Sequence, residues 1–380
     1  MQVEPTETQA LVQRTARDFA TRVVAPLAAT IDATAALPDE LLAGLAGLGL
    51  MAVNVPTDLG GSGAGAVAYA LAVEEIASAC ASTAVAMSVT NMVGETLARF
   101  GRGALASRFC PRLAGGGHGL GAFALSEPGA GSDAGALRTV ARRDGASWVI
   151  DGAKQWISGG PQADVFVVWA RTRPPETGVR GLSCFVVERG APGLAVGKPE
   201  DKMGLRGSST VPLEFAACRV PEGALLGAEN EGFKIAMAAL DGGRIGIAAQ
   251  AIGIARAALR ESLEYAQARR TFGVPIAQHQ AIQHKLADLG TLIDAAHLLC
   301  MRAAWHKDRG EAFTREASMA KVFASEAAVR VCNEAVQIHG GYGYIREFAA
   351  ERHLRDARVT TIYEGTSEIQ RIVIARGLLE

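Results

Sequence analysis

The sequence predicts an α+β fold in three parts: an N-terminal helical domain (residues 1–118), a middle antiparallel β domain (residues 119–228) and a C-terminal helical bundle (residues 229–380). Apolar residues recur at helical spacing at both ends of the chain. The middle consists instead of short apolar runs separated by Gly, Pro and Asp, which is typical of strands and turns. At 380 residues, the chain is long enough for two or three such parts.

The N-terminal part, from about Glu7 to Leu113, contains a clear helix start. A proline and two acids at Pro38-Asp39-Glu40 are followed by leucines at helical spacing, namely Leu41, Leu42, Leu45 and Leu48. The loop GGSGAG at residues 60–65 interrupts this helical block. We therefore expect several helices here rather than one.

The middle part contains runs such as WVIDG, DVFVVWAR and GLSCFVVE, with little sequence between them for crossover helices. Because parallel strands need such crossovers, the strands are predicted to be mostly antiparallel. Beyond Glu231, long Ala-rich periodic stretches begin near Phe233, His279 and Ala317. Their length and regular apolar spacing predict a helical bundle.

Charge and cysteine content argue against several classes of protein. Lys plus Arg number 38 and Asp plus Glu 39, so the net charge is −1, and neither nucleic acid nor a membrane surface is an expected partner. The start MQVEPTETQA lacks the features of a signal peptide, and no stretch approaches ~18 uninterrupted apolar residues. We therefore expect a cytoplasmic protein. The six cysteines stand at least thirty residues apart, which predicts reduced, buried thiols rather than disulfides.

Neither a common nucleotide motif nor a metal motif is found in the sequence. The Rossmann fingerprint GxGxxG does not occur, and the nearest run, GAGSDAG at residues 129–135, has the wrong spacing. The Walker motif is missing as well. The seven histidines include no HExxH pair, and His279 and His284 are five residues apart, a poor fit to one helical face. No metal site is therefore expected.

Gly-rich segments that carry hydroxyl or aromatic side chains remain at residues 122–133, 152–160 and 336–344. Each has an ordinary structural explanation: a Pro-Gly turn, a tryptophan in the core, and a helix that ends at paired glycines. In the second segment, Trp156 and Ser158 would share one face of an extended strand. A planar ring with a hydroxyl nearby would also suit a flat redox ring.

Glu364 is a candidate general base. Ser367 and Gln370 form an S-x-x-Q capping box, which predicts a helix that begins near Glu368, and Glu364 lies in the loop just before it. The helix dipole favours an ionised carboxylate there by ~0.3–1 kcal/mol, whereas burial beside Ile362 and Tyr363 would oppose ionisation. A carboxylate whose pKa can be tuned in this way suits proton abstraction. A solvated acid near a helix cap is the simpler alternative.

Seven segments together resemble those of the acyl-CoA dehydrogenases, FAD flavoproteins with a helical, β-barrel, helical architecture. They run in order from about Ala122 to the C-terminus: LSEPGAGSDAGAL, DGAKQWISGG, EDKMGLRGSST, ALDGGRIGIAAQAIGIA, ARRTFGVPIAQHQAIQ, VQIHGGYGY and ERHLRDARVTTIYEGTSEIQR. The helical block before them fits the family in length. DKMGLRGSST and LDGGRIGIA look most similar to the short-chain, butyryl-type branch. The resemblance thus implies an acyl-CoA dehydrogenase-like fold with a barrel-like middle domain.

The resemblance also implies a set of FAD contacts. The flavin would be lined by Phe123, Ala124, Leu125 and Ser126, with Trp156, Ile157 and Ser158 on its other side. Many members carry Thr where Ser158 stands, so the hydroxyl is kept and a methyl group is lost. Pyrophosphate and adenine contacts across a subunit interface would come from Arg269, Thr271, Phe272, Gln280, Gln337, Gly340 and Gly341. Contacts at the last helix would come from Thr366, Ser367 and Glu368.

For the substrate, the resemblance implies contacts from Ser132, Asp241, Arg244 and Gly365. Glu364 matches the catalytic base, which removes the proton α to the thioester while the β-carbon delivers hydride to flavin N5. Some members carry the base at the position of Gly243 instead. Because glycine cannot act as a base, Glu364 is the only candidate, and the isovaleryl-type branch is disfavoured.

The function implied is FAD-dependent α,β-desaturation of a short or short branched acyl-CoA. The protein would be a homotetramer, a dimer of dimers, and would pass electrons to an electron-transfer flavoprotein. Two alternatives stay open: a flavin oxidase or monooxygenase of the same fold, and a non-catalytic acyl-CoA-binding protein. Oxidase relatives often carry a long C-terminal extension, whereas this sequence ends at Glu380. A binding protein would not require Glu364, Trp156, Ser158 and the RRTFG motif.

Overall fold

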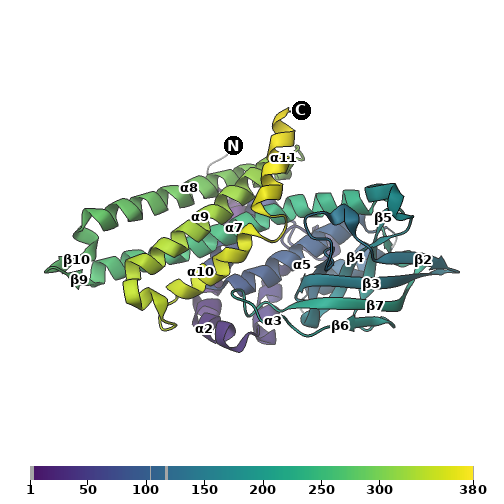
Figure 1. The fold of residues 1–380 in the computed structure, drawn as a ribbon, viewed down its shortest axis with the longest axis horizontal. Coiled ribbons are helices and arrows are strands. Elements are labelled where there is room, and N and C mark those ends of the chain that lie inside the picture. The colour runs from purple at the N-terminus through teal and green to yellow at the C-terminus, as the bar shows by residue number, and fades with distance from the viewer. Residues whose placement is uncertain (1–3, 103, 116–118, 380) are drawn as a thin grey trace.

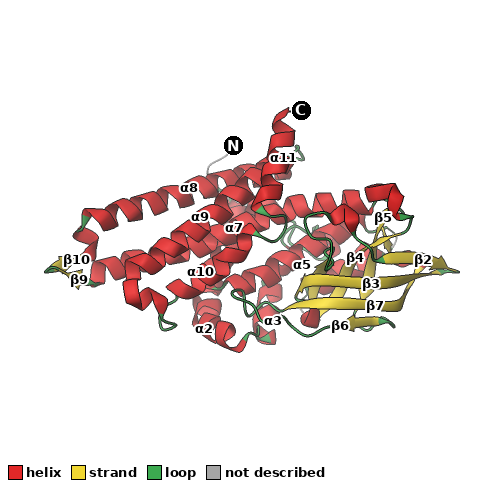
Figure 2. Ribbon diagram, in the orientation of Figure 1, coloured by secondary structure: helices red, strands yellow, loops and turns green. Residues whose placement is uncertain are grey.

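A computed structural model describes residues 4–102, 104–115 and 119–379 of the chain. The helical, β, helical order is confirmed: helices come first, a sheet follows, and long helices complete the fold (Figure 1). Figure 2 shows the sheet at one end of the molecule and helices over the rest. The first and third parts share one hydrophobic cluster, to which α1 and α4 contribute together with α7, α8 and α9.

The N-terminal helices surround a core of small and apolar side chains. α3 begins directly after Pro38 with Asp39 and Glu40 in its first turn, as predicted. Residues 60–64 form the predicted interruption, and α4 begins at Gly65. The helices are α1 (Glu7–Phe19), α2 (Ala25–Thr34), α3 (Asp39–Gly47), α4 (Gly65–Ala79), α5 (Ala81–Phe100) and α6 (Leu105–Ala114), with a π-helical turn over Ala20–Val24.

The middle part is an eight-stranded sheet in the order β6-β7-β3-β2-β4-β5-β8, with β1 paired to β4. Most pairs are antiparallel, as predicted, but β1 runs parallel to β4, and β2 meets β4 in parallel at one residue pair. Trp148, Phe166, Trp169 and Phe185 fill the core of this part. The strands are β1 (Leu120–Ala124), β2 (Val140–Asp144), β3 (Ser147–Ser158), β4 (Ala163–Arg171), β5 (Leu182–Glu188), β6 (Leu194–Val196), β7 (Thr210–Pro221) and β8 (Leu225–Leu226).

The C-terminal part is the predicted bundle of long helices. Its helices are α7 (Gly232–Ala268), α8 (Gln280–Asp308), α9 (Thr314–His339), α10 (Ala350–Arg358) and α11 (Ser367–Leu379). Between α7 and α8, β9 (Arg270–Thr271) and β10 (Val274–Pro275) form a small hairpin at the end of the bundle far from the sheet (Figure 1). By length and composition α7 could cross a membrane, but 72% of its most apolar window is buried. We therefore assign α7 as a core helix of the bundle.

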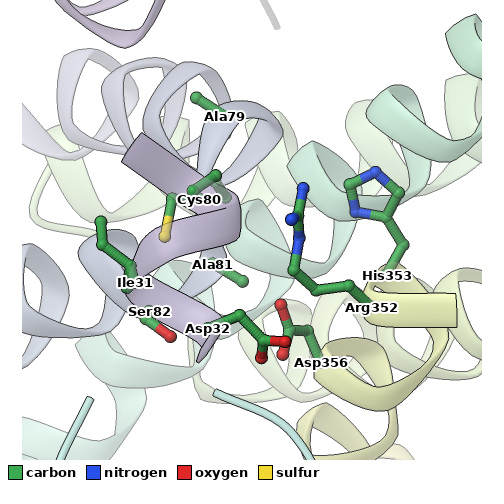
Figure 3. Close-up of a pocket in the computed structure, with 11 residues that line it drawn as sticks. Ile31, Asp32, Ala79, Cys80, Ala81, Ser82, Arg352, His353 and Asp356 are labelled. Atoms are coloured by element: carbon green, nitrogen blue, oxygen red, sulfur yellow. The ribbon is translucent and has the colours of Figure 1, made fainter. Parts of the chain in front are cut away.

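A small polar cavity lies where α2, the start of α5 and α10 meet (Figure 3). Its volume is about 10 Å³, room for roughly one water molecule. The carboxyl group of Asp356 accepts a hydrogen bond from the backbone N–H of Leu205 at 2.6 Å, and burial raises the pKa of Asp356 to about 6. Arg355 binds Asp32 beside it. The Asp356 contact ties the β6–β7 loop to α10, the helix that leads toward Glu364, and the Arg355 contact ties α10 to α2.

All six cysteines are free and buried, as expected from their spacing. Cys184 and Cys218 lie in the β core, and Cys300 and Cys332 lie in the helical core. Burial raises the pKa of these thiols, which keeps them in the protonated, unreactive form.

Candidate active site

Glu364 lies in a tight turn between α10 and α11, ahead of the last helix as predicted. Its φ is +51° and that of Gly365 is +90°, so two consecutive residues adopt the left-handed conformation. A non-glycine residue in this region costs of order 1 kcal/mol and persists only when its surroundings hold it. The side-chain amide of Gln370 supplies one such restraint, since its Nε2 donates to the carbonyls of Glu364 and Gly365 at 3.2 and 2.9 Å.

The Glu364 carboxylate faces the α7 helix at Gly243. A Cβ atom at Gly243 would lie 1.9 Å from Glu364 Oε2 and 2.9 Å from the Met92 sulfur, so only glycine leaves room for this carboxylate. Glu364 Oε2 is buried and has no hydrogen-bond partner among the described residues. Burial raises the pKa of Glu364 to about 7, although the positive charges of Lys321 and Arg244 act in the opposite direction. Of the two opposing effects expected from the sequence, burial is therefore the larger one, and it raises the pKa of Glu364.

The neighbours that bury Glu364 differ in part from those expected. Ile362 is largely exposed and does not cover the carboxylate. Tyr363 is directed instead toward Gln250, to which its hydroxyl donates a hydrogen bond. The local sequence therefore identified only part of the cover: Tyr363 is buried beside Glu364, whereas Ile362 is exposed and helices far away in the chain complete the enclosure.

Asp241 and Arg244 lie on α7 next to Gly243. Arg244 donates from its NH1 group to Asp241 Oδ1 at 2.6 Å, and Asp241 also accepts a hydrogen bond from Thr314 at 2.5 Å. The guanidinium is almost fully buried, and its Nε atom lacks a partner in the described part of the chain. The Arg244 Nε–H group is therefore a buried donor without a partner among the described residues. Arg244 directly follows Gly243, the residue that the Glu364 carboxylate faces.

The predicted capping box at α11 is wrong in its details. The helix begins at Ser367, one residue earlier than expected, and Thr366 is the residue whose hydroxyl accepts the N–H of Ile369 at 3.3 Å. The hydroxyl of Ser367 and the Oε1 atom of Gln370 are buried without partners within residues 4–102, 104–115 and 119–379. Gln370 turns back to the Glu364 turn instead of capping the helix. Glu368 is exposed at the helix start.

Two β-domain segments predicted to line a flavin lie side by side. The Gln155 N–H donates to the Ser126 carbonyl at 2.9 Å, which joins the loop after β1 to the end of β3. Lys154, fully buried, donates to Glu127 at 2.9 Å and to the Leu125 carbonyl at 3.1 Å. Phe123 packs against Trp169 with tilted rings, 4.4 Å between ring centroids.

Trp156 corrects another expectation from the sequence. Its φ of +65° and a register shift between Lys154 and Ile157 break the alternation of the strand, so Trp156 and Ser158 do not simply share one face. The indole is 62% exposed, whereas Ile157 is buried. Trp156 is therefore not a core residue. Ser158 is partly buried, and Ser132 is exposed in the loop after the Pro-Gly turn.

The remaining predicted cofactor residues lie at the far end of the bundle. A cavity of about 450 Å³ is lined by Arg269, Thr271, Gly340 and Gly341, among others. Phe272, Gln280 and Gln337 lie nearby on the same end but do not line it, and Phe272 is 97% exposed. Helix α7 separates Gly243 from Arg269 by 26 residues, or roughly 39 Å at 1.5 Å per residue.

Sequence reasoning missed several residues around Glu364. Lys321 on α9 is fully buried and donates from Nζ to the Gly365 carbonyl at 2.7 Å. Met92, Tyr69 and Gln250 approach from α5, α4 and α7. A signal for Lys321 was present, because it continues the apolar stripe formed by Ala317, Ala320, Ala324 and Ala328. The other three look like ordinary core residues in the sequence.

Comparison with known proteins assigns the family. Models of the N-terminal, middle and C-terminal domains of acyl-CoA dehydrogenases match residues 6–117, 122–218 and 230–379. The chain belongs to the acyl-CoA dehydrogenase family. It is 49% identical over 379 residues to the human mitochondrial short-chain specific acyl-CoA dehydrogenase, covering 99% of this chain and 91% of that protein. An acyl-CoA dehydrogenase of Bacillus subtilis is 48% identical, with 98% of each chain covered.

Solved structures give the same assignment. Butyryl-CoA dehydrogenase from Megasphaera elsdenii superposes with a TM-score of 0.97 at 42% identity, and both chains are fully covered. A chain described as the electron transferring flavoprotein of Acidaminococcus fermentans gives a TM-score of 0.98 at 41% identity, again over both full chains. A glutaryl-CoA dehydrogenase from Mycobacterium smegmatis, solved with FADH2, is 30% identical with a TM-score of 0.93 and covers 98% of this chain and 95% of that one.

We expect Gly243→Ala in this acyl-CoA dehydrogenase to displace the Glu364 carboxylate without unfolding the protein, because the atom it meets is the end of a flexible side chain. If Glu364 takes part in the reaction, reduction of the enzyme by butyryl-CoA should slow at least about tenfold, since small misplacements of a reacting group are costly. The matched control is Gly290→Ala on α8, where an added Cβ meets nothing within 4 Å. The control should keep the wild-type rate and gain about 0.5–1 kcal/mol of stability. Equal rates in both variants would contradict the placement of Glu364.

Proposed function

We propose that this acyl-CoA dehydrogenase uses FAD to convert a short or short branched acyl-CoA into its α,β-unsaturated product, with Glu364 as the base. The observation that carries the proposal is the buried Glu364 carboxylate, whose Oε2 faces the small gap at Gly243 without a partner in the described chain. Burying a carboxylate without a hydrogen-bond partner is unfavourable, and such groups are typical of active sites. Its pKa of about 7 leaves it able to take up a proton near neutral pH.

The residues present fit FAD. The largely exposed Trp156 indole and the partly buried hydroxyls of Ser126 and Ser158 stand on two segments joined by a backbone hydrogen bond, which offers a flat apolar surface beside polar groups. Arg269 at the 450 Å³ cavity supplies a cation suited to a diphosphate. Bound FAD supplies the acceptor for the hydride that leaves the β-carbon of the acyl group.

We propose that each FAD site is built from two subunits of a tetramer. Within one chain, Arg269 lies roughly 39 Å along α7 from Gly243, so it serves a different cofactor from the one beside its own Glu364. The exposed Phe272 and Tyr344 at that end leave apolar surface for a neighbouring subunit to cover. Arg269, Thr271, Gly340 and Gly341 would then complete the site of a partner, as the sequence motifs imply.

In the reaction we propose, the Glu364 carboxylate takes the α-proton and becomes a carboxylic acid. The α-carbon electrons form the new double bond as the β-hydrogen leaves as hydride. Arg244, held against Asp241, places a buried positive charge near the carboxylate and so favours its ionised form before the proton is taken. Gly243 and the Met92 sulfur lie beside the Glu364 carboxylate and give it an apolar border on the α7 side.

A short acyl chain is favoured by the side chains along α7 beyond Gly243. At Gly246 an added Cβ would lie 2.4 Å from the Tyr69 hydroxyl, so this side chain fills the next helical turn. Gln250, a further turn along, binds the Tyr363 hydroxyl and donates to the Ala81 carbonyl at 3.1 Å. We propose that these side chains limit the acyl chain to one or two helical turns beyond Gly243, about 5–10 Å. The short-chain and butyryl-type relatives support the same substrate class.

An electron-transfer flavoprotein is the electron acceptor we propose. The similarity to the chain described with the Acidaminococcus fermentans flavoprotein supports this partner. The oxidase alternative has less support: the prolyl acyl carrier protein oxidase AnaB is 31% identical, below the 42% of butyryl-CoA dehydrogenase from Megasphaera elsdenii and the 48–49% of the short-chain and Bacillus subtilis dehydrogenases.

Replacing the base tests the proposal. Glu364→Gln keeps the size of the side chain but cannot accept a proton, so anaerobic flavin reduction by saturating butyryl-CoA should slow by ~10²–10⁴-fold in stopped-flow. FAD content and butyryl-CoA binding should stay at wild-type levels. Glu214→Gln, on an exposed part of β7, is the control and should react normally. Wild-type reduction by Glu364→Gln would show that the α-proton leaves by another route.

Substrate length is tested with a straight-chain acyl-CoA panel. Each buried methylene should improve binding by about 0.8 kcal/mol until the pocket is full, after which longer chains clash with Tyr69 and Gln250. We expect kcat/KM to be highest near butyryl-CoA and to fall at octanoyl-CoA. A value that still rises beyond octanoyl-CoA would contradict the pocket described above.

A further inference from the structure

Lys321 is a buried cation that the reaction as described does not use. It lies in the middle of α9 with no exposed side-chain surface, on the helix face that carries Ala317 and Ala324. Burying an ammonium group is costly unless it is paired. The structure gives Lys321 no ion pair with any described carboxylate, and its hydrogen bond is to the Gly365 carbonyl at 2.7 Å.

The carbonyl that Lys321 holds belongs to the turn that aims Glu364. Gly365 adopts φ +90° and Glu364 φ +51°, and the Gly365 carbonyl also accepts from Gln370 at 2.9 Å. Lys321 thus ties this strained turn to α9, whereas Gln370 ties it only to the following helix. Without the bond from α9, the turn loses its restraint toward the body of the bundle.

Charged and titratable groups approach Glu364 from every helix packed around it. Lys321 comes from α9 and Arg244 from α7, and both favour its ionised form. Tyr69 on α4 and Tyr363 stay protonated, because burial and the Glu364 charge raise the pKa of each hydroxyl. The outer groups are Asp241 on α7, Glu95 on α5, Lys307 on α8 and Glu368 on α11. Arg244 is already neutralised in part by Asp241, which leaves Lys321 as the cation without a paired acid.

We propose that Lys321 is a positioning residue for proton abstraction: it anchors the Glu364–Gly365 turn and supplies the positive charge that favours an ionised, unpaired carboxylate. The inference rests on the proposed role of Glu364. Burial lowers the pKa of Lys321 to about 8, with the Glu364 charge acting the other way, so the ammonium form is still the major one at pH 7. The two groups therefore support each other's charged forms across the neutral range.

The test compares Lys321→Met, which keeps the length of the side chain without the charge, with Lys321→Arg, which keeps the charge and the donor. Lys234→Met, at an exposed lysine on α7, is the control. Anaerobic reduction of each holoenzyme by butyryl-CoA is followed from pH 5.5 to 9.5. For Lys321→Met, we expect the acid limb of the rate profile to move up by about one unit or more, with a rate about tenfold lower at pH 7. Most of the rate should return at pH 9.

Lys321→Arg should restore the wild-type acid limb, and Lys234→Met should leave it unchanged. A second readout needs no turnover. In the wild type, the folded protein binds fewer protons than the unfolded chain between the lowered pKa of Lys321, about 8, and its ordinary value of 10.5. Wild-type stability should therefore rise with pH across this window relative to Lys321→Met, whose melting temperature lacks that component.

A rate loss in Lys321→Met that is the same at all pH values would overturn the electrostatic role, and an unchanged profile would overturn the proposal altogether. If Lys321→Met does not fold, Lys321→Arg and Lys321→Gln decide in the same way, since Gln retains a donor but not the charge. Failure of this inference is distinct from failure of the proposed function. Glu364→Gln would still lose its rate in the first case and would keep it in the second.

Discussion

The Glu364 carboxylate is enclosed by four helices from distant parts of the chain, with a buried oxygen that no described group satisfies. Burying this carboxylate is unfavourable, and several surrounding residues reduce that cost. Gly243 gives it space, Arg244 and Lys321 give it positive charge without a direct ion pair, and Gln370 holds its turn. Burial still dominates and raises the pKa of Glu364 to about 7, the range in which a base can take up a proton and release it again.

The length of α7 imposes a second constraint. One helix carries Gly243 and Arg244 in its first half and ends just before Arg269, so the contact with Glu364 and the distal cavity are held roughly 39 Å apart. This separation is the basis of our proposal that the cofactor sites are shared between subunits. Its small residues allow close packing: Gly246 admits Tyr69, and Gly253 lies against the α4 backbone.

Features that depend on neighbouring residues in the sequence could be predicted from it. Apolar periodicity predicted the helical, β, helical succession, and the Pro-Asp-Glu signal predicted the start of α3 after Pro38. The capping motif placed Glu364 in the loop before α11, although the cap itself differs in detail. Features set by distant contacts were missed. The Trp156 bulge arises from pairing with β7, and the cap of α11 moved to Thr366 because Gln370 turns back to the Glu364 turn. The proposed role of Lys321 depends on α9 packing beside that turn: the apolar stripe of α9 indicates that Lys321 is buried but not which turn it reaches.

The protonation state of Glu364 is the most direct test of this account. Difference infrared spectra of the wild-type and Glu364→Gln holoenzymes, recorded from pH 5 to pH 9, isolate the carbonyl stretch of the protonated Glu364 side chain. The account predicts a band that is present at pH 5, absent from the variant, and lost with a midpoint near pH 7. A carboxylate that is already ionised at pH 5 would contradict it, because such a group would be solvated or directly paired rather than buried and free to accept the α-proton.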